Sequence, residues 1–136
     1  MLKNQVALVT GASRGIGQAI ARELGKYGAC VVGTATSEAG AQGISAQLEK
    51  EGIKGCGMVL NVRDAAQVEQ VLEAIRARFG EISILVNNAG ITRDNLLMRM
   101  KDEEWDEVMD TNLKSVFRLS RAVLRSMMKA RQGRII

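Results

Sequence analysis

The chain has 136 residues, of which 46% are hydrophobic, and it carries a net charge of +4, no histidine and two cysteines. This composition suits one packed domain, and no apolar run is long enough for a membrane span or a secretory signal, so we expect a cytoplasmic protein. With so few metal-binding side chains we expect no zinc site. With only one Trp, one Tyr and two Phe we expect no stacking surface for nucleic acid.

Short apolar runs alternate with stretches of helical spacing along the chain. Ser37 and Asp64 stand where two helices would begin, as N-caps, and Gly28, Gly52 and Gly80 stand where helices would end. We therefore predict strands over residues 6–9, 30–34, 57–60, 82–86 and 134–136, and helices over residues 16–27, 38–50, 64–79 and 102–130.

Apolar strands that alternate with helices are typical of a parallel sheet covered on both faces. Right-handed crossovers then predict an α/β fold, a Rossmann-like doubly wound sheet of strand order 3-2-1-4-5, in a single domain over residues 1–136. Ligands of such sheets bind beyond the carboxyl ends of the strands, where the strand order reverses. Here that point lies between the first and fourth strands.

A glycine-rich turn of spacing TGxxxGxG, over residues 10–17, joins the first predicted strand to the first helix. Glycines let the backbone approach a pyrophosphate closely, and the first N–H groups of the helix point at the anion. Taken alone, the turn is also compatible with an ordinary strand-to-helix connection. The residues that we predict to hold the cofactor here are Gly11, Ala12, Ser13, Arg14, Gly15, Ile16 and Gly17.

Polar residues or glycines also follow the other three strands of the predicted site. Thr36 comes at the end of the second strand, Asn61 and Val62 follow the third, and residues 87–90 follow the fourth. Asn and Gly are common after any strand, so one such position means little. Four of them at one edge of the sheet favour a dinucleotide site.

The end of the second strand bears on which dinucleotide is bound. Enzymes of this architecture that use NAD place an acidic residue there, on the ribose 2′-hydroxyl. In this chain no carboxylate precedes Glu38, and Arg14 lies in the glycine turn that would face this position. A cation with nearby hydroxyls favours a 2′-phosphate, so we predict NADP(H), although Arg14 is also compatible with a solvated loop charge.

These motifs resemble those of the short-chain dehydrogenase/reductase family, in the same order and at similar separations. Residues 10–17 match its TGxxxGxG loop and residues 87–90 match its NNAG motif, while Asn112 matches the asparagine of its catalytic tetrad. The resemblance implies that Asn112 orders a water of the proton relay. It also implies contacts with the adenine and the nicotinamide ribose, made respectively by Asn61 and Val62 and by Asn88, Ala89 and Gly90.

Within this family, residues 88–100 are similar to bacterial reductases that act on 3-oxoacyl groups bound to acyl carrier protein. The similarity implies NADPH-dependent reduction to the 3-hydroxyacyl group in fatty acid biosynthesis. Two alternatives stay open, a family member that acts on another ketone or alcohol, and a non-catalytic NADP-binding regulator. A YxxxK motif further along the protein would separate the enzymes from the regulator.

The family's proton donor is the tyrosine of that YxxxK motif, and a serine holds the substrate oxygen. The one tyrosine here, Tyr27, is followed four positions later by Val31 and not by lysine. The sequence ends at Ile136, within the fifth predicted strand. We therefore expect the N-terminal portion of a longer enzyme, and we expect these 136 residues alone to be inactive.

The predicted helix over residues 102–130 carries features that bear on partners. Its apolar residues exceed one sheet-facing stripe, which favours either a broad buried face or, as in the family, a homotetramer interface. Arg125, Lys129 and Arg131 form a basic cluster near its end, joined by Arg134. The cluster is compatible with stabilisation of the helix dipole or with docking of the acidic acyl carrier protein. The apolar residues are Met109, Leu113, Val116, Phe117, Val123, Leu124, Met127 and Met128.

Overall fold

The computed structural model describes residues 1–90 and 99–136. Five strands form one sheet in the order β3-β2-β1-β4-β5, and all four neighbouring pairs are parallel, as predicted. The order reverses between β1 and β4, so the crevice for a ligand lies at their carboxyl ends. The strands are β1 (Val6–Val9), β2 (Cys30–Ala35), β3 (Gly55–Val59), β4 (Ile84–Val86) and β5 (Arg134–Ile135).

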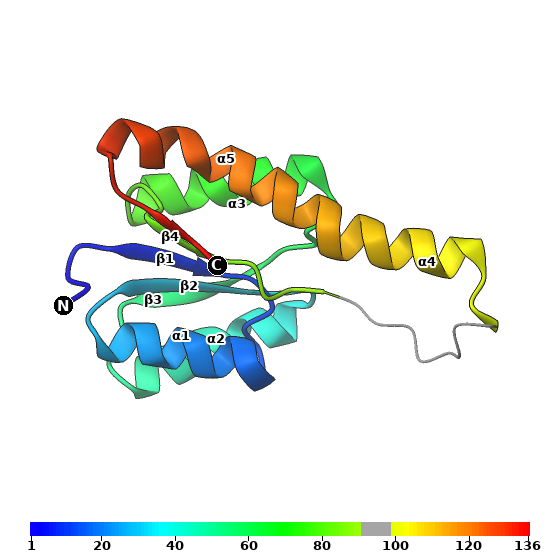
Figure 1. The fold of residues 1–136 in the computed structure, drawn as a ribbon. Coiled ribbons are helices and arrows are strands. Elements are labelled where there is room, and N and C mark those ends of the chain that lie inside the picture. The colour runs from blue at the N-terminus through cyan, green and yellow to red at the C-terminus, as the bar shows by residue number, and fades with distance from the viewer. Residues whose placement is uncertain (91–98) are drawn as a thin grey trace.

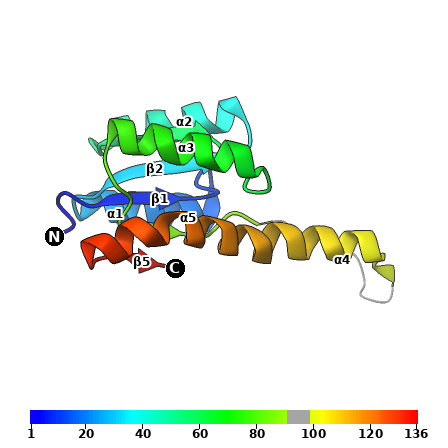
Figure 2. The same ribbon diagram turned by 90° about the horizontal axis from the view of Figure 1, so that it is seen from above.

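Helices cover both faces of this sheet. Figure 1 shows α1 and α2 on one face, α3 and α5 on the other, and α4 extending past the carboxyl ends of the strands. In the view from above, α4 and α5 follow one another along a nearly common axis (Figure 2). Of the described helices, none is both long and apolar enough to cross a membrane. The helices are α1 (Gly15–Lys26), α2 (Glu38–Lys50), α3 (Ala65–Arg78), α4 (Asp102–Met109) and α5 (Ser115–Ala130).

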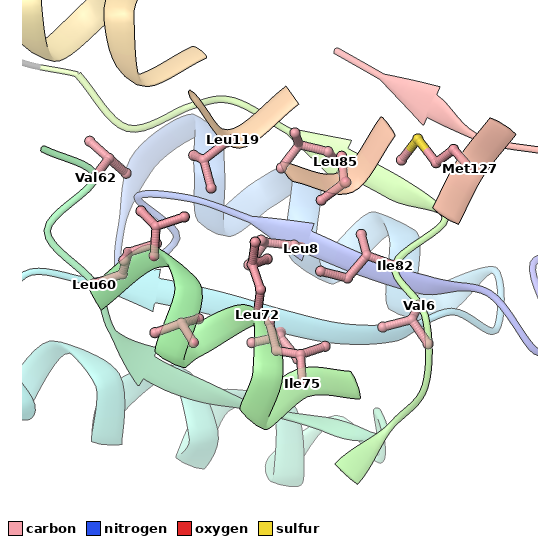
Figure 3. Packing of buried hydrophobic residues seen from close by; sticks show 14 residues of the cluster. Val6, Leu8, Leu60, Val62, Leu72, Ile75, Ile82, Leu85, Leu119 and Met127 are labelled. Atoms are coloured by element: carbon pink, nitrogen blue, oxygen red, sulfur yellow. The ribbon is translucent and has the colours of Figure 1, made fainter. Parts of the chain in front are cut away.

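The core has two parts because side chains of a strand alternate between the two faces of the sheet. Leu8 of β1 packs on the α3–α5 face, with Leu72 of α3 and Leu119 of α5. Figure 3 shows these side chains pointing toward one another between the helices and the sheet. Val9 packs on the opposite face, in a cluster that includes Leu48 of α2.

The predicted caps of two helices are confirmed. The Ser37 hydroxyl accepts a hydrogen bond from the Gly40 N–H at 3.0 Å, at the start of α2. The Asp64 carboxylate accepts one from the Gln67 N–H at 3.1 Å, at the start of α3. Each side chain satisfies an N–H group that the helix itself leaves without a partner, which fixes where the helix begins.

Two predicted strand starts were wrong. β3 begins at Gly55, not at residue 57, because five consecutive pairings with β2 hold the segment from Gly55 to Val59 in the sheet. β4 begins at Ile84, not at residue 82, and its pairing with β1 starts there, opposite Ala7. The predicted ends of the long helix, residues 102 and 130, are confirmed, but a π-helical turn, Asp110–Lys114, interrupts it between α4 and α5.

The apolar residues of α5 divide into two stripes. Leu119, Val123 and Met127 recur every four residues and are buried against the sheet and α3. A second stripe remains on the outside of the helix. Its members on α5 are Phe117 at 60% exposure, Leu124 at 44% and Met128 at 68%, and Leu113 of the preceding π turn, at 61%, continues it.

Candidate functional site

The buried Thr10 side chain joins the carboxyl ends of β1 and β4. Its Oγ1 accepts the backbone N–H groups of Asn88, at 3.1 Å, and Ala89, at 2.9 Å. The side-chain amide of Asn88 donates in turn to the Gly11 carbonyl at 3.0 Å. The glycine turn and the NNAG segment, far apart in the sequence, are therefore held side by side.

The start of α1 presents N–H groups to the crevice. Arg14 is the N-cap residue in extended conformation, and its side chain makes no capping hydrogen bond. The starts of α2 and α3, in contrast, are capped by Ser37 and Asp64. An uncapped helix start with a glycine turn before it is suited to an anion, because N–H groups and the positive end of the helix dipole face the same point.

Two glycines of the turn allow a very close approach of chain segments. Gly11 has φ +64, which side chains other than glycine rarely adopt. A Cβ at Gly17 would overlap the Gly11 carbonyl oxygen and come within 2.5 Å of the Asn88 amide nitrogen. Any side chain at position 17 would therefore push α1 away from the turn.

A cavity of about 420 Å³ opens over these segments at the carboxyl ends of the strands. Most of the residues predicted to bind a dinucleotide line it together, and none of the described lining residues carries a carboxylate. A cavity without negative charge accommodates phosphates at the lowest electrostatic cost. The lining residues are Gly11, Ser13, Arg14, Gly15, Ile16, Thr34, Ala35, Thr36, Leu60, Asn88, Ala89 and Gly90.

Four predicted site residues lie outside this lining. Ala12 and Gly17 are buried beneath it, and the Ala12 N–H donates to the Thr34 carbonyl at 2.8 Å. Asn61 is exposed in the turn between β3 and α3, where its side-chain oxygen accepts the Arg63 N–H at 3.0 Å. The Val62 side chain is buried in the α3–α5 core, so only its backbone is available to a ligand.

Asn112 lies in the middle of the π turn between α4 and α5. A Cβ added to Gly90 would come 2.7 Å from the Asn112 Oδ1, so the end of the NNAG segment passes directly against this side chain. π turns interrupt the regular hydrogen bonding of a helix and occur often at functional sites. The structure thus brings Asn112 to the same edge of the sheet as the glycine turn.

Two buried polar side chains beside predicted site residues have no hydrogen-bond partner in the described part of the chain. They are the amide of Asn87, next to Asn88, and the hydroxyl of Thr111, next to Asn112. An unpaired buried polar group costs about 1–3 kcal/mol, and such groups are commonly satisfied by water or a bound molecule. Both positions are therefore places where further hydrogen bonds can form.

A larger, more open hollow of about 870 Å³ lies along α4 and the π turn. Four carboxylates line it, on Glu103, Asp106, Glu107 and Asp110, which disfavours a dinucleotide phosphate. Burial opposes ionisation of Asp110, but hydrogen bonds from Lys114 and Arg63 outweigh it and hold the pKa of its carboxyl below the usual value. We therefore place the dinucleotide in the smaller cavity.

Sequence reasoning did not assign a binding role to several residues of this edge. Thr10 was noted only as part of a motif, yet its hydroxyl holds the two segments together. Thr34 accepts the Gly11 N–H at 3.4 Å, and Ala35 and Leu60 line the cavity. All of them lie at strand ends, and that position is the signal that could have identified them. An apolar residue at a strand end, however, has no sequence feature that distinguishes it from a core residue.

The residues present fit a phosphorylated dinucleotide. The glycine turn and the uncapped start of α1 line the cavity, and so do Arg14 and Thr36, a cation and a hydroxyl suited to a phosphate. Residues 91–98, which carry most of the segment compared with the 3-oxoacyl reductases, lie outside the described residues.

The fold, with its parallel sheet of order β3-β2-β1-β4-β5 and its glycine turn after β1, is that of a Rossmann-like α/β protein. Residues 5–136 match the family model described as short chain dehydrogenase. The chain belongs to the short chain dehydrogenase family, as its motifs predicted.

Three similar relatives from different bacteria carry the same name. The chain is 67% identical over 134 residues to the 3-oxoacyl-[acyl-carrier-protein] reductase FabG of Escherichia coli (strain K12), covering 98% of this chain and 54% of that protein. The proteins of the same name from Haemophilus influenzae and Pseudomonas aeruginosa are 64% and 61% identical, covering 99% of this chain and 54% and 55% of their own. The chain thus spans about half the length of these relatives.

Proposed function

We propose that the intact protein is an NADPH-dependent reductase, which converts 3-oxoacyl groups on acyl carrier protein to 3-hydroxyacyl groups during fatty acid biosynthesis in the cytoplasm. The observation that carries the proposal is the junction of the glycine turn, Asn88 and Asn112 at one edge of the sheet. The names of the relatives support the substrate class. Residues 1–136 form the dinucleotide-binding unit in this proposal.

The reaction adds a hydride to the ketone carbon and a proton to its oxygen. NADPH, when bound, supplies the hydride. In this proposal the N–H groups at the start of α1 hold the pyrophosphate, Arg14 and Thr36 hold the 2′-phosphate, and Asn88 to Gly90 border the nicotinamide ribose. Asn112 orders a water that passes the proton to the site. No YxxxK motif lies within the 136 residues, so the proposed proton donor belongs to another part of the protein.

The proposal is tested by following NADPH oxidation by the intact protein. We expect NADPH to be consumed only when a 3-oxoacyl thioester of acyl carrier protein is added, with the 3-hydroxyacyl thioester as product. Asn112→Ala should lower kcat by about 100-fold, the lower range for loss of a proton-transfer group. Turnover of an unrelated ketone alone would favour another substrate, and tight NADPH binding without turnover would favour a regulator.

The basic cluster at the end of α5 is proposed to dock the acidic carrier protein. Arg125, Lys129 and Arg131 are all exposed, and Arg131 caps the helix in the left-handed conformation at φ 54. Long-range attraction between such a patch and an acidic partner raises the association rate. We expect Arg131→Glu to lower kcat/KM for carrier-bound substrate by about ten-fold and to spare a small thioester surrogate.

Lys50→Glu is the matched control, because Lys50 is also a cation in the last turn of a helix. If the cluster only stabilises a helix dipole, both variants should lose similar stability and leave carrier-bound turnover equally unaffected. Equal losses on both substrates would contradict docking by Arg131.

The exposed stripe of α5 is proposed to form the interface of a homotetramer. Leu113, Phe117, Leu124 and Met128 are large apolar side chains on one solvent-facing side of the helix. Contiguous apolar surface of this kind marks an interaction site more often than an ordinary surface. We expect sedimentation of a tetramer, with Phe117→Glu shifting the protein to smaller species. A wild-type monomer in analytical ultracentrifugation would refute the interface.

A further inference from the structure

The turn between β3 and α3 is well ordered by its own hydrogen bonds. The Asn61 side chain accepts the Arg63 N–H, and the Asn61 carbonyl accepts the Asp64 N–H at 2.9 Å. The Asp64 carboxylate then caps α3. Because hydrogen bonds hold the turn at both ends, we expect contact with a ligand to affect the whole turn as one unit.

Two arginines connect this turn with the segment that carries Asn112. Arg63 of the turn donates from Nε to the Asp110 Oδ2 at 3.3 Å and lies 3.6 Å from the Glu107 Oε1. Arg118 of α5 reaches back to the turn and donates a hydrogen bond from Nη1 to the Val62 carbonyl at 2.9 Å. Arg63 thus contacts residues before Asn112, and Arg118 comes from the helix after it.

The acceptor Asp110 is the first residue of the π turn. Its carboxylate is also 3.4 Å from the Lys114 Nζ, at the other end of the same turn. Asn112 lies between these two residues and packs against Gly90. Side-chain contacts thus join the turn after β3 to Asp110, the backbone of the π turn joins Asp110 to Asn112, and Asn112 contacts the NNAG segment.

We infer that Arg63 is a positioning residue, which through Asp110 couples occupancy of the adenine end of the cofactor site to the placement of Asn112. The inference rests on the proposed function, in which Asn61 and Val62 border the adenine. According to this inference, a ligand at the adenine end does more than add to the affinity for the cofactor. A ligand there would also steady the π turn at the opposite end of the site.

Trp105 of α4 offers a direct readout, since it is the one tryptophan among the 136 residues and lies two positions before Glu107. The probe is adenosine 2′,5′-bisphosphate, which would fill the adenine end and leave the nicotinamide end empty. In the intact wild-type protein we expect a saturable change in Trp105 emission. The part of the emission change that is lost in Trp105→Phe comes from Trp105, and this part alone is compared between variants.

Arg63→Gln keeps a polar side chain but removes the charge. We expect it to bind the probe within about three-fold of wild type while losing most of the Trp105 response, because binding and coupling are separate quantities. Arg63→Lys should restore part of the response. Arg76→Gln is the matched control, since Arg76 of α3 also pairs with two carboxylates, at 3.3 and 3.5 Å, and should respond as wild type.

Turnover gives a second readout. Arg63→Gln should lower kcat by about five-fold and leave the KM for NADPH within about two-fold. Asp110→Asn should have the same effect, and the double variant should be no more impaired than either single variant. A full Trp105 response in Arg63→Gln, or an equal loss in Arg76→Gln, would overturn the inference. Failure of the probe to bind wild type would overturn both the cofactor site and the inference. A normal response without ketone reduction would overturn only the proposed reaction.

Discussion

Replacing Gly17 by alanine should raise the dissociation constant for NADPH by about 100-fold or more, because the added methyl group closes the phosphate cradle. A Cβ at this position would overlap the Gly11 carbonyl oxygen and crowd the Asn88 amide. Both neighbours are fixed, the first as backbone and the second by its hydrogen bond to Gly11. The start of α1 must therefore move away from the turn, and its N–H groups lose the position from which they would bind phosphate.

The same substitution should lower stability by about 1–3 kcal/mol, the usual cost of overpacking. Gly43→Ala supplies the control, since Gly43 is exposed in α2 and a Cβ there would meet no atom within 4 Å. Alanine should stabilise that helix by about 0.5–1 kcal/mol and leave cofactor binding unchanged. Thermal unfolding and isothermal titration of the two variants give both quantities. Wild-type NADPH affinity in Gly17→Ala would exclude the cradle as the binding site.

Replacing Arg14 by alanine should change cofactor preference. Arg14 and Thr36 both line the cavity, and no carboxylate lies among the described lining residues. A charge-assisted hydrogen bond to phosphate is worth about 1.5–3 kcal/mol, and the exposure of Arg14 places the expected value at the low end. We therefore expect the dissociation constant for NADPH to rise by about ten-fold, and that for NADH to stay within about two-fold.

The comparison between cofactors is what makes this measurement decisive. Arg14→Lys should keep part of the preference, since lysine retains the charge but not the planar donor pair. High salt should reduce the difference between NADPH and NADH in wild type more than in Arg14→Ala. Equal effects of Arg14→Ala on both cofactors would mean that Arg14 is an ordinary solvated loop residue, and the assignment of NADP(H) would fail.

The sheet order could be predicted from the general rule of right-handed crossovers. The starts of α2 and α3 could be predicted because their signals are local. Ser37 and Asp64 mark helix starts by hydrogen bonds made within three residues. The start of β3 could not be predicted in this way. Its glycines have low strand propensity, and only the pairing with β2, a non-local contact, keeps Gly55 in the sheet.

The glycine turn and the NNAG segment were recognisable because each places several glycine or asparagine residues at a fixed spacing directly after a strand. The π turn was not, since the sequence from Asp110 to Lys114 is compatible with a regular α-helix. The contact of Arg63 with Asp110 also has no local signal, because its partners are 47 residues apart in the chain. Whether Asn61 and Val62 contact a cofactor stays a prediction.

The cores on the two faces of the sheet are completed at different points along the chain. Among the residues that the structure describes, all members of the core between the sheet and α1–α2 lie at or before Val86. The core on the other face is incomplete without Leu119, Val123 and Met127 of α5. As the chain leaves the ribosome, the α1–α2 side, which includes the glycine turn, therefore has all its own packing partners first. The side that carries Asn112 closes only once α5 has emerged.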